Sequence, residues 1–361
     1  MDFRVLALDE ERDLWDAALA RFRPELRDVY FESGYALVWQ RHGDGRAYGA
    51  LGTEPGARFL YPFLVRDLAE LPGLGAAAAG LVDLATPYGY GGILADIASD
   101  DPGPIARFRS AFGAWCEQRG VVSEFIRFHP LLATQRGLAP HVDVAEVSET
   151  VVCPLDGGPE QLLASMDPAH RRGLRKAQRS GLVARADLGD EGYEEFRRLY
   201  TETMERRSAL ATYFFDEAYF RAFRELLGPK QSLIGVFLGD EMIAGGLMMR
   251  SARWAHYHLG GSSARHLELR PNNLLFYEAM LWARGHGAEA LHLGGGYRGD
   301  DDLLRFKRGF GAGRGAFAVG RAVHRLADYE RLAALHRERA GRTVEGYFPA
   351  YRAPAAAGDG H

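Results

Sequence analysis

Apolar and polar positions along the chain follow two periods, and together they predict a protein built from alternating strands and helices. Apolar residues spaced three and four apart predict helices over residues 10–21, 104–118 and 273–284. Short apolar runs between turn residues predict strands over residues 35–39, 59–65, 121–128, 232–238, 242–249, 254–259 and 290–293. Pro62 places the second of these runs at a sheet edge or a bulge, because proline cannot donate to a strand ladder.

The same order of elements occurs twice, which predicts a duplicated fold. Aromatic stretches end in paired glycines at Gly92 and Gly261, and each precedes a helix, a glycine stop and a strand. We therefore expect an α/β (α+β) protein with two tandem halves, each a mixed, mostly antiparallel sheet flanked by helices. The expected division is residues 1–150, residues 151–322, and a C-terminal helix with a disordered tail over residues 323–361. Ala, Pro and Gly dominate that tail beyond about Tyr347.

Composition narrows the function classes. The chain has 361 residues, 47% of them hydrophobic, which suffices for two domain cores. The only cysteines, Cys116 and Cys153, exclude a disulfide scaffold and a cysteine-rich metal site, and no metal is expected. No apolar run approaches the roughly 20 residues that span a bilayer, and the N-terminus lacks the pattern of a signal peptide. We therefore expect a cytoplasmic protein without membrane contact. The formal net charge of −4 means that a polyanionic partner needs a local basic patch.

A basic helix is predicted between Asp167, as its N-cap, and Gly181, as its stop, with Pro168 in the first turn. Five cations fall on one broad face of this helix: Arg171, Arg172, Arg175, Lys176 and Arg179. A solvated helix face is one explanation of such a charge run. No acidic residue occurs over residues 169–186, however, so the like charges have no internal counter-ion, which favours binding of a polyanion.

The stretch from Leu304 to Gly311 carries a lone lysine, Lys307, between Phe306 and Phe310. It follows a short apolar strand and the glycine turn at residues 294–296, and glycine allows a close approach of backbone or ligand. An ammonium in apolar surroundings can donate hydrogen bonds to an oxyanion where water competes poorly. The alternative is a surface lysine whose stem lies over two core phenylalanines.

These segments resemble the FemABX-like aminoacyltransferases of the GNAT superfamily. The basic helix, residues 170–182, is similar to the segment that opens the second half of those proteins, and Thr203-Met204-Glu205-Arg206 is similar to their Thr-x-x-Arg element. Residues 273–280, the glycines 294–296 and the Leu-x-Phe-Lys-x-x-Phe-Gly pattern of residues 304–311 resemble their C-terminal signature. The resemblance extends over about residues 30–325 and implies two GNAT-like halves.

The resemblance also implies transfer of an aminoacyl group from aminoacyl-tRNA to an amine of a small molecule or a peptide, with no other cofactor. It places Phe306 and Lys307 at the reaction centre, where the lysine stabilises the oxyanion, and it places Arg206 and Tyr257 against the acceptor. The basic helix is the expected tRNA-binding element. Tyrosines of the glycine turns are expected to line the substrate site, unless they pack only on the sheet edge: Tyr88, Tyr90 and Tyr297. The helical arm of some members is absent, which favours a compact enzyme with a small acceptor.

Two other functions remain open. A GNAT-type N-acyltransferase would take its acyl group from acyl-CoA or from an acyl-carrier-protein thioester. The loop that would hold the coenzyme diphosphate, residues 270–275, contains no glycine and carries Pro271, which lacks a backbone donor. The other function is a non-catalytic binding module that retains the fold, and Lys307 beside an intact glycine turn argues against it.

The remaining titratable residues give weaker signals. The candidates for a general base are His256, His258 and Glu278, although each residue type is common in purely structural positions. Asp300-Asp301-Asp302 resembles a metal-binding cluster, but three consecutive side chains do not converge without a tight loop, so a solvated acidic loop is the simpler interpretation.

Overall fold

The computed structural model describes residues 1–98, 101–296, 301–340 and 346–354, and it contains two compact units. Unit 1 comprises Met1–Phe22, Tyr30–Glu146 and the described residues from Ala318 onward. Unit 2 comprises Arg23–Val29 and Val147–Phe317. The chain passes from unit 1 to unit 2 within strand β7 (Asp143–Pro154) and returns within strand β13 (Gly313–Val323). A short N-terminal segment, Arg23–Val29, therefore belongs to the unit that the C-terminal half of the sequence builds.

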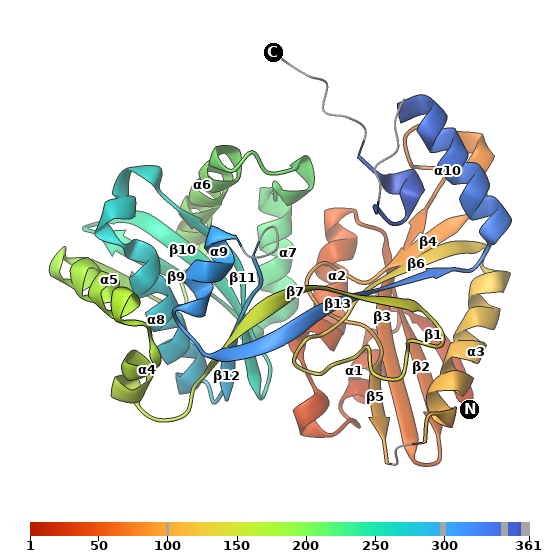
Figure 1. Ribbon diagram of the computed structural model, residues 1–361, viewed down its shortest axis with the longest axis horizontal. Coiled ribbons are helices and arrows are strands. Elements are labelled where there is room, and N and C mark those ends of the chain that lie inside the picture. The colour runs from red at the N-terminus through yellow and green to blue at the C-terminus, as the bar shows by residue number, and fades with distance from the viewer. Residues whose placement is uncertain (99–100, 297–300, 341–345, 355–361) are drawn as a thin grey trace. The chain divides into compact units, whose positions relative to one another are not determined.

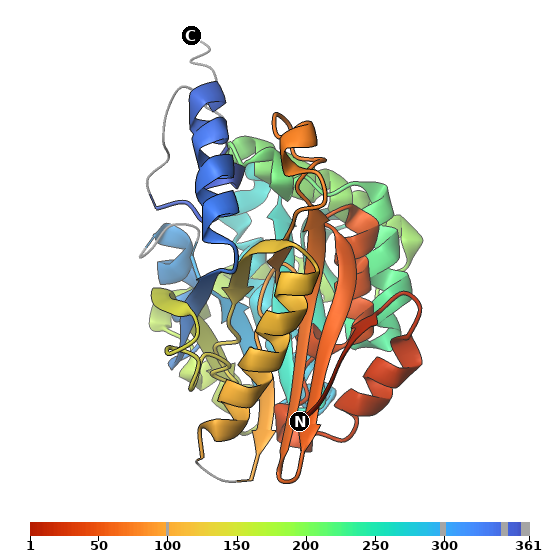
Figure 2. The same cartoon turned by 90° about the vertical axis from the view of Figure 1, so that its right-hand side faces the viewer.

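Unit 1 is a mixed sheet covered by helices (Figure 1). Its described strands have the order β1-β2-β3-β4-β6-β13, with β5 paired to β3, and β4 and β6 form the parallel pair. The bounds are β1 (Asp2–Ala7), β2 (Arg46–Glu54), β3 (Ala57–Asp67), β4 (Val82–Ala85), β5 (Leu94–Ile97) and β6 (Val121–Arg127). The α-helices are α1 (Arg12–Leu19), α2 (Ser33–His42), α3 (Gly103–Gln118) and α10 (Leu326–Ala340). Figure 2 shows α3 lying across the near face of this sheet.

Unit 2 repeats the arrangement around its own parallel pair. Its strands have the order β7-β12-β11-β10-β9-β8, and β11 and β12 are parallel. The bounds are β8 (Leu182–Arg185), β9 (Gln231–Leu238), β10 (Glu241–Arg250), β11 (Trp254–Ser262) and β12 (Ala290–Gly294). The helices are α4 (Pro159–Ser165), α5 (Pro168–Arg179), α6 (Asp190–Arg206), α7 (Glu217–Leu227), α8 (Pro271–Gly285) and α9 (Asp302–Arg308). A parallel strand pair with a helix in its connection thus occurs in both units, and the predicted α/β (α+β) class is confirmed, with mixed, mostly antiparallel strands flanked by helices in each unit.

Helices α6 and α8 cover opposite faces of the unit 2 sheet. Gly245 and Gly246 are neighbours in β10, so their hydrogens point to opposite sides of the strand. A Cβ atom on Gly245 would lie 2.8 Å from the ring of Phe196 in α6, whereas one on Gly246 would lie 3.4 Å from Leu275 in α8. The two glycines therefore let a helix approach the strand closely from each side.

Two strand predictions differ from the structure. Residues 35–39, predicted as a strand, lie in α2, because a short run that is apolar at every position has no decisive period. Gly43, with a φ of 97°, ends that helix. Pro62 lies inside β3, at neither an edge nor a bulge. β5 pairs with residues 57–60 of β3 and β4 with residues 64–67, so the residues between them have no ladder partner on that side among the described strands. This gap accommodates a residue without an N–H.

The C-terminal tail also differs from its prediction. Residues 346–354, expected to be disordered, pack on unit 1. Tyr351 is completely buried and its hydroxyl lies 2.7 Å from that of Ser123. The guanidinium of Arg352 donates to both carboxylate oxygens of Asp83, at 2.6 and 2.9 Å. A single aromatic anchor and one ion pair therefore order a segment whose overall composition is typical of disorder.

Within the described residues, none of the helices combines the length and the apolar character that crossing a lipid bilayer requires.

The close approach of α6 to β11 gives a stability prediction. A Cβ atom on Gly261 would lie 2.8 Å from the backbone of Leu199 and Tyr200, which cannot move without shifting α6. Gly261→Ala should therefore lower the free energy of unfolding by about 1–3 kcal/mol, measured by urea denaturation. Gly285→Ala is the matched control in the same unit, because nothing lies within 4 Å of the added methyl group. Equal stability of the two variants would contradict this packing.

Candidate active site

Lys307 is carried by the short helix α9, and three contacts fix that helix. Its first turn is capped by Asp301, whose carboxylate accepts from the backbone N–H of Leu304 at 2.8 Å. Its last turn is tied to α5, because the N–H of Asp167 donates to the carbonyl of Gly309 at 2.8 Å. Gly311 follows against β7, where a Cβ atom would come within 2.6 Å of the carbonyl oxygen of Val152. Gly311 therefore lets the chain that follows Lys307 pack closely on β7.

The lysine itself is buried, with an exposed fraction of 5%. Its ammonium donates to the carbonyl oxygen of Gly295 at 2.7 Å and lies 5.4 Å from the centre of the Tyr257 ring. Burial lowers the pKa of Lys307 from 10.5 to about 7; the carboxylate of Asp301 opposes this shift and the charge of Arg207 adds to it. No described carboxylate lies within ion-pair distance of Nζ. Lys307 is thus an enclosed cation, and the alternative of a solvent-exposed lysine over the two phenylalanines does not apply.

A β-bulge in β11 directs Tyr257 toward Lys307. The pairing of β10 with β11 shifts register between Leu247 and Met248, so that His258 is the extra residue in β11. Tyr257 consequently shares a face with Gly260, where a Cβ atom would collide with the Tyr257 hydroxyl. The Tyr257 ring packs on Phe276 of α8, with 4.9 Å between ring centres. Without the extra residue, strand alternation would place Tyr257 on the face that α6 covers.

Strands β11 and β12 separate at this point. They pair in parallel only from Trp254 to His256, although β11 continues to Ser262. The rest of β11 therefore has no β12 partner, and Tyr257 is the first residue beyond the ladder. Lys307, bonded to Gly295 just after β12, lies beside this opening. A reacting group placed there would find strand backbone without a β12 partner on one side and an ammonium on the other.

The Thr-x-x-Arg element fixes the free end of β11. The Thr203 hydroxyl accepts from the N–H of Ser262 at 3.0 Å, and Arg206 donates to the Ser262 carbonyl at 3.1 Å. Arg206 also forms an ion pair with Glu202, at 3.6 Å. Arg206, predicted to contact the acceptor, is therefore engaged in holding the strand, whereas the neighbouring Arg207 acts electrostatically on Lys307.

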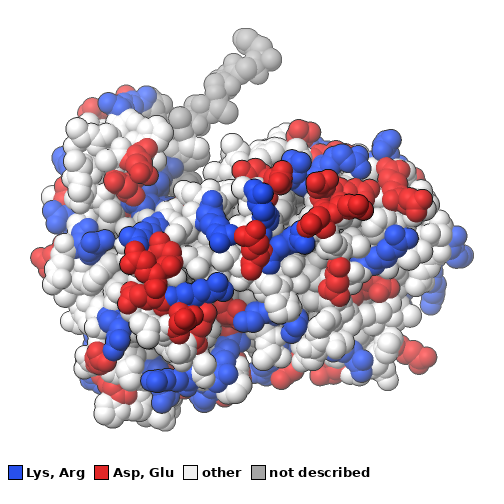
Figure 3. Space-filling view, turned by 180° about the vertical axis from the view of Figure 1, so that it is seen from behind, with Lys and Arg blue, Asp and Glu red and all other residues white. Residues whose placement is uncertain are grey.

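The basic helix is α5, and its cations have different surroundings. Arg171 donates to the carbonyls of Ala164 and Met166, both at 2.9 Å, so it caps the end of α4. The other four cations are exposed and, among the described residues, have no ion-pair partner: Arg172, Arg175, Lys176 and Arg179. Asp167 occupies the N-cap position of α5, as predicted, but its side chain makes no capping bond. Elsewhere, on the face shown in Figure 3, positive and negative side chains are interspersed.

Phe306 and the predicted tyrosines have packing partners in their own units. Phe306 contacts His170 of α5 and Phe276 of α8, with ring centres 5.0 and 5.8 Å apart. In unit 1 the Tyr88 carbonyl accepts from the Tyr35 hydroxyl at 2.6 Å, and the Tyr90 ring lies 5.4 Å from that of Tyr30. Tyr297 and Asp300 lie outside the described residues. The substrate-binding role of the three tyrosines stays a prediction.

The histidines considered as general bases face away from Tyr257. His258 bonds the Tyr219 hydroxyl at 2.7 Å and stacks on Phe223 of α7, and burial lowers its pKa to about 3. This pKa makes His258 a neutral structural residue at physiological pH. His256 precedes Tyr257 in the strand and is fully buried on the opposite face. Burial raises the pKa of Glu278, in α8.

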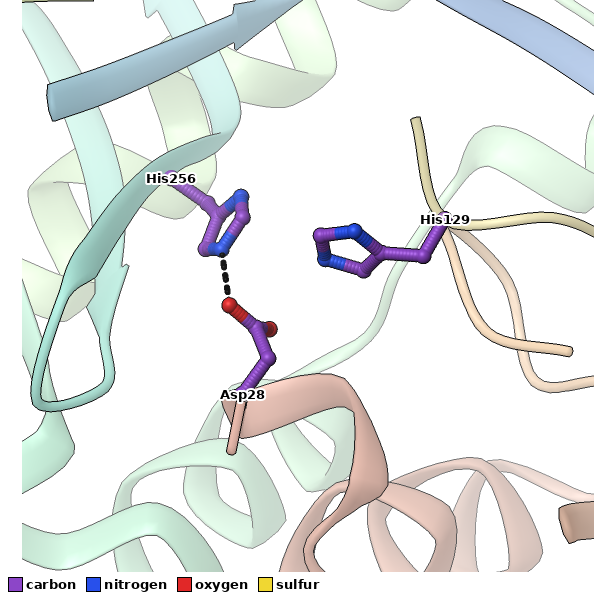
Figure 4. A group of neighbouring side chains, drawn as sticks. All are labelled: Asp28, His129 and His256. Atoms are coloured by element: carbon purple, nitrogen blue, oxygen red, sulfur yellow. Dashed lines mark hydrogen bonds and ion pairs between the residues drawn. The ribbon is translucent and has the colours of Figure 1, made fainter. Parts of the chain in front are cut away.

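His256 belongs to a cluster of buried polar side chains that the sequence did not predict, together with Asp28, Ser251 and His292. Figure 4 shows Asp28 and His256 pointing toward each other, with their hydrogen bond of 2.9 Å. Asp28 also accepts from Ser251 at 3.3 Å, and the second ring nitrogen of His256 lies 3.3 Å from a ring nitrogen of His292. Asp28 comes from the segment Arg23–Val29, so these contacts attach that segment to β11 and β12. No local sequence signal predicts a pairing between residues 228 positions apart.

This geometry supports acyl-transfer chemistry. A lysine ammonium has three hydrogens, and one of them binds Gly295. The other two can donate to an oxyanion that develops beside Tyr257, in a site that excludes most water. The described residues near Lys307 provide no nucleophilic serine or cysteine with an adjacent base, so the arrangement suits direct attack of one substrate on another.

Comparisons with known proteins agree with this fold and chemistry. Residues 168–308 match the family model described as an acetyltransferase (GNAT) domain. The structure is similar to that of FemX, with 16% sequence identity, a TM-score of 0.69, and coverage of 92% of this chain and 99% of FemX. It is also similar to L-PGS from Bacillus licheniformis, with 15% identity, a TM-score of 0.53, and coverage of 85% and 91%. A tandem GNAT protein from the clavulanic acid biosynthesis pathway gives 12% identity, a TM-score of 0.50, and coverage of 90% and 98%. No curated protein matches the sequence.

These likenesses show the fold: two tandem GNAT-like halves, as the resemblance to FemABX-like proteins predicted. The match to the GNAT family model adds that unit 2 carries an acyltransferase domain. The protein is therefore an acyltransferase, and Lys307 lies within the matched region.

The buried charge of Lys307 gives a second stability prediction. The pKa of Lys307 is about 7 in the folded chain and 10.5 in the unfolded chain. Burial of the charge therefore lowers the free energy of unfolding, and this effect has its full size below pH 7. That destabilisation fades as pH rises from 7 to 10.5. Lys307→Met should therefore raise the free energy of unfolding at pH 6 by on the order of 2 kcal/mol, after loss of the Gly295 bond. The gain should be smaller at pH 9, as measured by urea denaturation.

Arg305→Met is the control for this experiment, because Arg305 is an exposed cation on the same helix. It should change stability by less than about 0.5 kcal/mol at both pH values. A Lys307→Met variant that is less stable than the native chain at pH 6 would mean that the ammonium contributes net stability.

Proposed function

We propose that the protein is an aminoacyltransferase that moves an aminoacyl group from aminoacyl-tRNA to an amine of a small molecule or a peptide. The observation that carries this proposal is the enclosed Lys307 ammonium beside Tyr257, in the same unit as a helix with four exposed cations that have no ion-pair partner in the described part of the chain. The lysine suits an oxyanion at an acyl carbon, and the helix suits a polyanionic donor. A cytoplasmic location belongs to the proposal, since charged tRNA is made there.

The reaction is aminolysis of an ester. The nitrogen of the neutral acceptor amine attacks the ester carbonyl carbon, a C–N bond forms, and the carbonyl oxygen becomes an oxyanion. Lys307 donates hydrogen bonds to that oxyanion, typically worth roughly 3 kcal/mol for one donor. The C–O bond to the terminal ribose then breaks, and the proton released by the amine ends on the ribose oxygen. Alignment of amine and ester supplies several further kcal/mol, and the ester is already activated.

The start of α8 favours this donor over coenzyme A. In coenzyme A-dependent members of the fold, free backbone N–H groups at this helix start hold the diphosphate. Here Pro271 has no N–H, and the N–H of Asn273 already donates to the carbonyl of Arg270 at 3.0 Å. Arg270 is in the left-handed region, with a φ of 62°. This helix start therefore has few backbone donors left for a diphosphate.

The alternative function is N-acyl transfer from acyl-CoA or from an acyl-carrier-protein thioester. The match of residues 168–308 to an acetyltransferase family model favours it. Both functions require an amine acceptor and a group such as Lys307 that donates hydrogen bonds to an oxyanion. They differ only in the substrate that supplies the acyl group.

An assay with defined donors separates the two functions. The protein should form an amide when incubated with aminoacylated total tRNA and a library of primary amines and peptides, with mass spectrometry as the readout. Ribonuclease treatment, or uncharged tRNA with free amino acid, should abolish product. Product from acyl-CoA alone, with none from charged tRNA, would replace the proposal by the alternative.

Lys307 and pH test the chemical step. Lys307→Ala should reduce single-turnover amide formation about a hundredfold, because an oxyanion donor is lost. In the native protein the rate should fall as pH rises above about 7, since the ammonium loses its proton there. This alkaline decline should disappear in Lys307→Ala. Because the acceptor amine also loses its proton as pH rises, the comparison is the ratio of the native rate to that of Lys307→Ala; a ratio that does not change through pH 7–9 would mean that titration of Lys307 does not control the reaction.

A further inference from the structure

A pocket of about 360 Å³ lies in unit 2 between α5, the start of α8 and α9. Figure 1 shows α5 and α8 side by side in this unit. This volume is at the lower end of the roughly 300–1,000 Å³ typical of small-molecule sites, so the pocket fits a nucleotide fragment. The lining residues are Ala169, His170, Arg172, Gly173, Lys176, Arg270, Asn273 and Phe306.

The pocket is cationic. Arg172 and Lys176 are four residues apart, so they project from the same face of α5, and Arg270 comes from the start of α8. None of the lining residues is acidic, and none of the three cations has an ion-pair partner among the described residues. By contrast, Arg308 of α9 and Arg314 of β13 do have an ion-pair partner, since both bind Glu149. Three unpaired cations around one cavity repel one another until an anion binds.

His170 lines the pocket from the first turn of α5. Its ring packs against Phe306 and Phe310. The position is tightly built, since a Cβ atom on Gly309 would collide with the ring. Burial lowers the pKa of His170, while the backbone of Phe306 and the charge of Asp167 oppose this shift.

Arg270 occupies a strained backbone position at the pocket. Its φ of 62° lies in the left-handed region, which is unfavourable for a residue with a long side chain. Strain of this kind persists where the surrounding structure needs the side chain in one place. The first residue of α8, Pro271, is buried and requires the chain to turn at Arg270. The turn brings a third cation to the pocket that α5 alone would not provide.

We infer that this pocket binds the last phosphodiester of the donor RNA, next to the nucleotide that carries the aminoacyl group. The inference rests on the proposed function. Phe306 lines the pocket and Lys307 follows it in α9, so the anion site and the oxyanion site are built on consecutive residues. In aminoacyl-tRNA a single ribose separates the terminal phosphodiester from the aminoacyl ester. In coenzyme A the whole pantetheine arm separates the diphosphate from the thioester, which does not match adjacent sites.

Binding of three deacylated tRNAs tests this assignment, with fluorescence anisotropy of the full chain as the readout. One tRNA is intact, one ends in a 3′-hydroxyl after removal of the terminal adenosine and its phosphate, and one lacks the adenosine but keeps a 3′-phosphate. The native protein should bind the phosphate-ended tRNA roughly tenfold more tightly than the hydroxyl-ended one. The doubly substituted Arg172→Gln/Lys176→Gln protein should bind both equally, and Arg270→Gln should lose part of the difference.

Arg175→Gln/Arg179→Gln is the matched control, because these cations lie on the same exposed helix but do not line the pocket. It should weaken binding of all three tRNAs equally. The slope of the logarithm of the binding constant against the logarithm of salt concentration should decrease by roughly two, as in the pocket variant. Thermal unfolding of each variant should match the native protein, since all four side chains are exposed. A pocket variant that keeps the tenfold preference, or a native protein that shows none, overturns the inference.

The pocket could instead bind the phosphates of coenzyme A. This is tested by measuring the binding of coenzyme A alone and its competition with tRNA. If it binds in a manner that Arg172→Gln/Lys176→Gln abolishes, and the 3′-phosphate has no effect, the pocket is a coenzyme site and the RNA assignment is wrong. Ribonuclease-sensitive amide formation that persists while the 3′-phosphate has no effect would retain the proposed function and reject the pocket. Absence of amide formation from charged tRNA would reject the function itself.

Discussion

Unit 2 holds an ammonium in a place that little water reaches. Among the described residues Lys307 donates to one oxygen, the carbonyl of Gly295, and it lies over the ring of Tyr257 instead of beside a carboxylate. An unpaired buried charge destabilises a fold by several kcal/mol, so the elements around it must be fixed independently. The Asp301 cap, the bond from Asp167 to Gly309, and the glycine contacts with β7 provide that fixation. Two of these contacts come from distant parts of the sequence, near residues 152 and 167, so the position of Lys307 depends on the folding of the rest of the unit.

The opening beside Lys307 follows from how β11 is held at its two ends. At its start β11 pairs with β12, and Asp28 reaches the same region through His256. At its far end β11 has lost β12 as a partner, and side chains of α6 replace the missing ladder at Ser262. The bulge at His258 lies between these two anchors and turns Tyr257 to the α8 face. The strand is thus held at both ends and bulged in the middle, where the bulge leaves one residue unpaired.

Much of this arrangement could be predicted from the sequence, because the relevant patterns are local. The basic helix and the glycine-flanked lysine each have a signature within a few residues. The run from residue 35 to 39 was assigned wrongly because five consecutive apolar residues fit a buried helix as well as a strand. The residue that contacts His256, Asp28, could not be found in this way, because the contact joins distant segments. The role of Arg206 required the structure for the same reason: its partner, the Ser262 carbonyl, is a backbone atom that no side-chain pattern reveals.

The buried arginine of unit 1 and the buried lysine of unit 2 have different partners. In unit 1 the buried Arg109 and Glu124 form two hydrogen bonds of 2.8 and 2.9 Å. Although burial raises the pKa of Glu124, Arg109 and His324 hold it well below its usual range, so the pair stays ionised. Asp83, also buried, is bonded by Arg66 and Arg352. Each of these charges is neutralised within its own unit, as expected of structural ion pairs. Lys307 of unit 2 has no such partner among the described residues, and a charge left without its counterpart is available to a negative charge that forms during a reaction. The buried arginine and carboxylates of unit 1 are thus paired, whereas Lys307 of unit 2 has no described carboxylate partner, and it is at Lys307 that we propose the oxyanion to form.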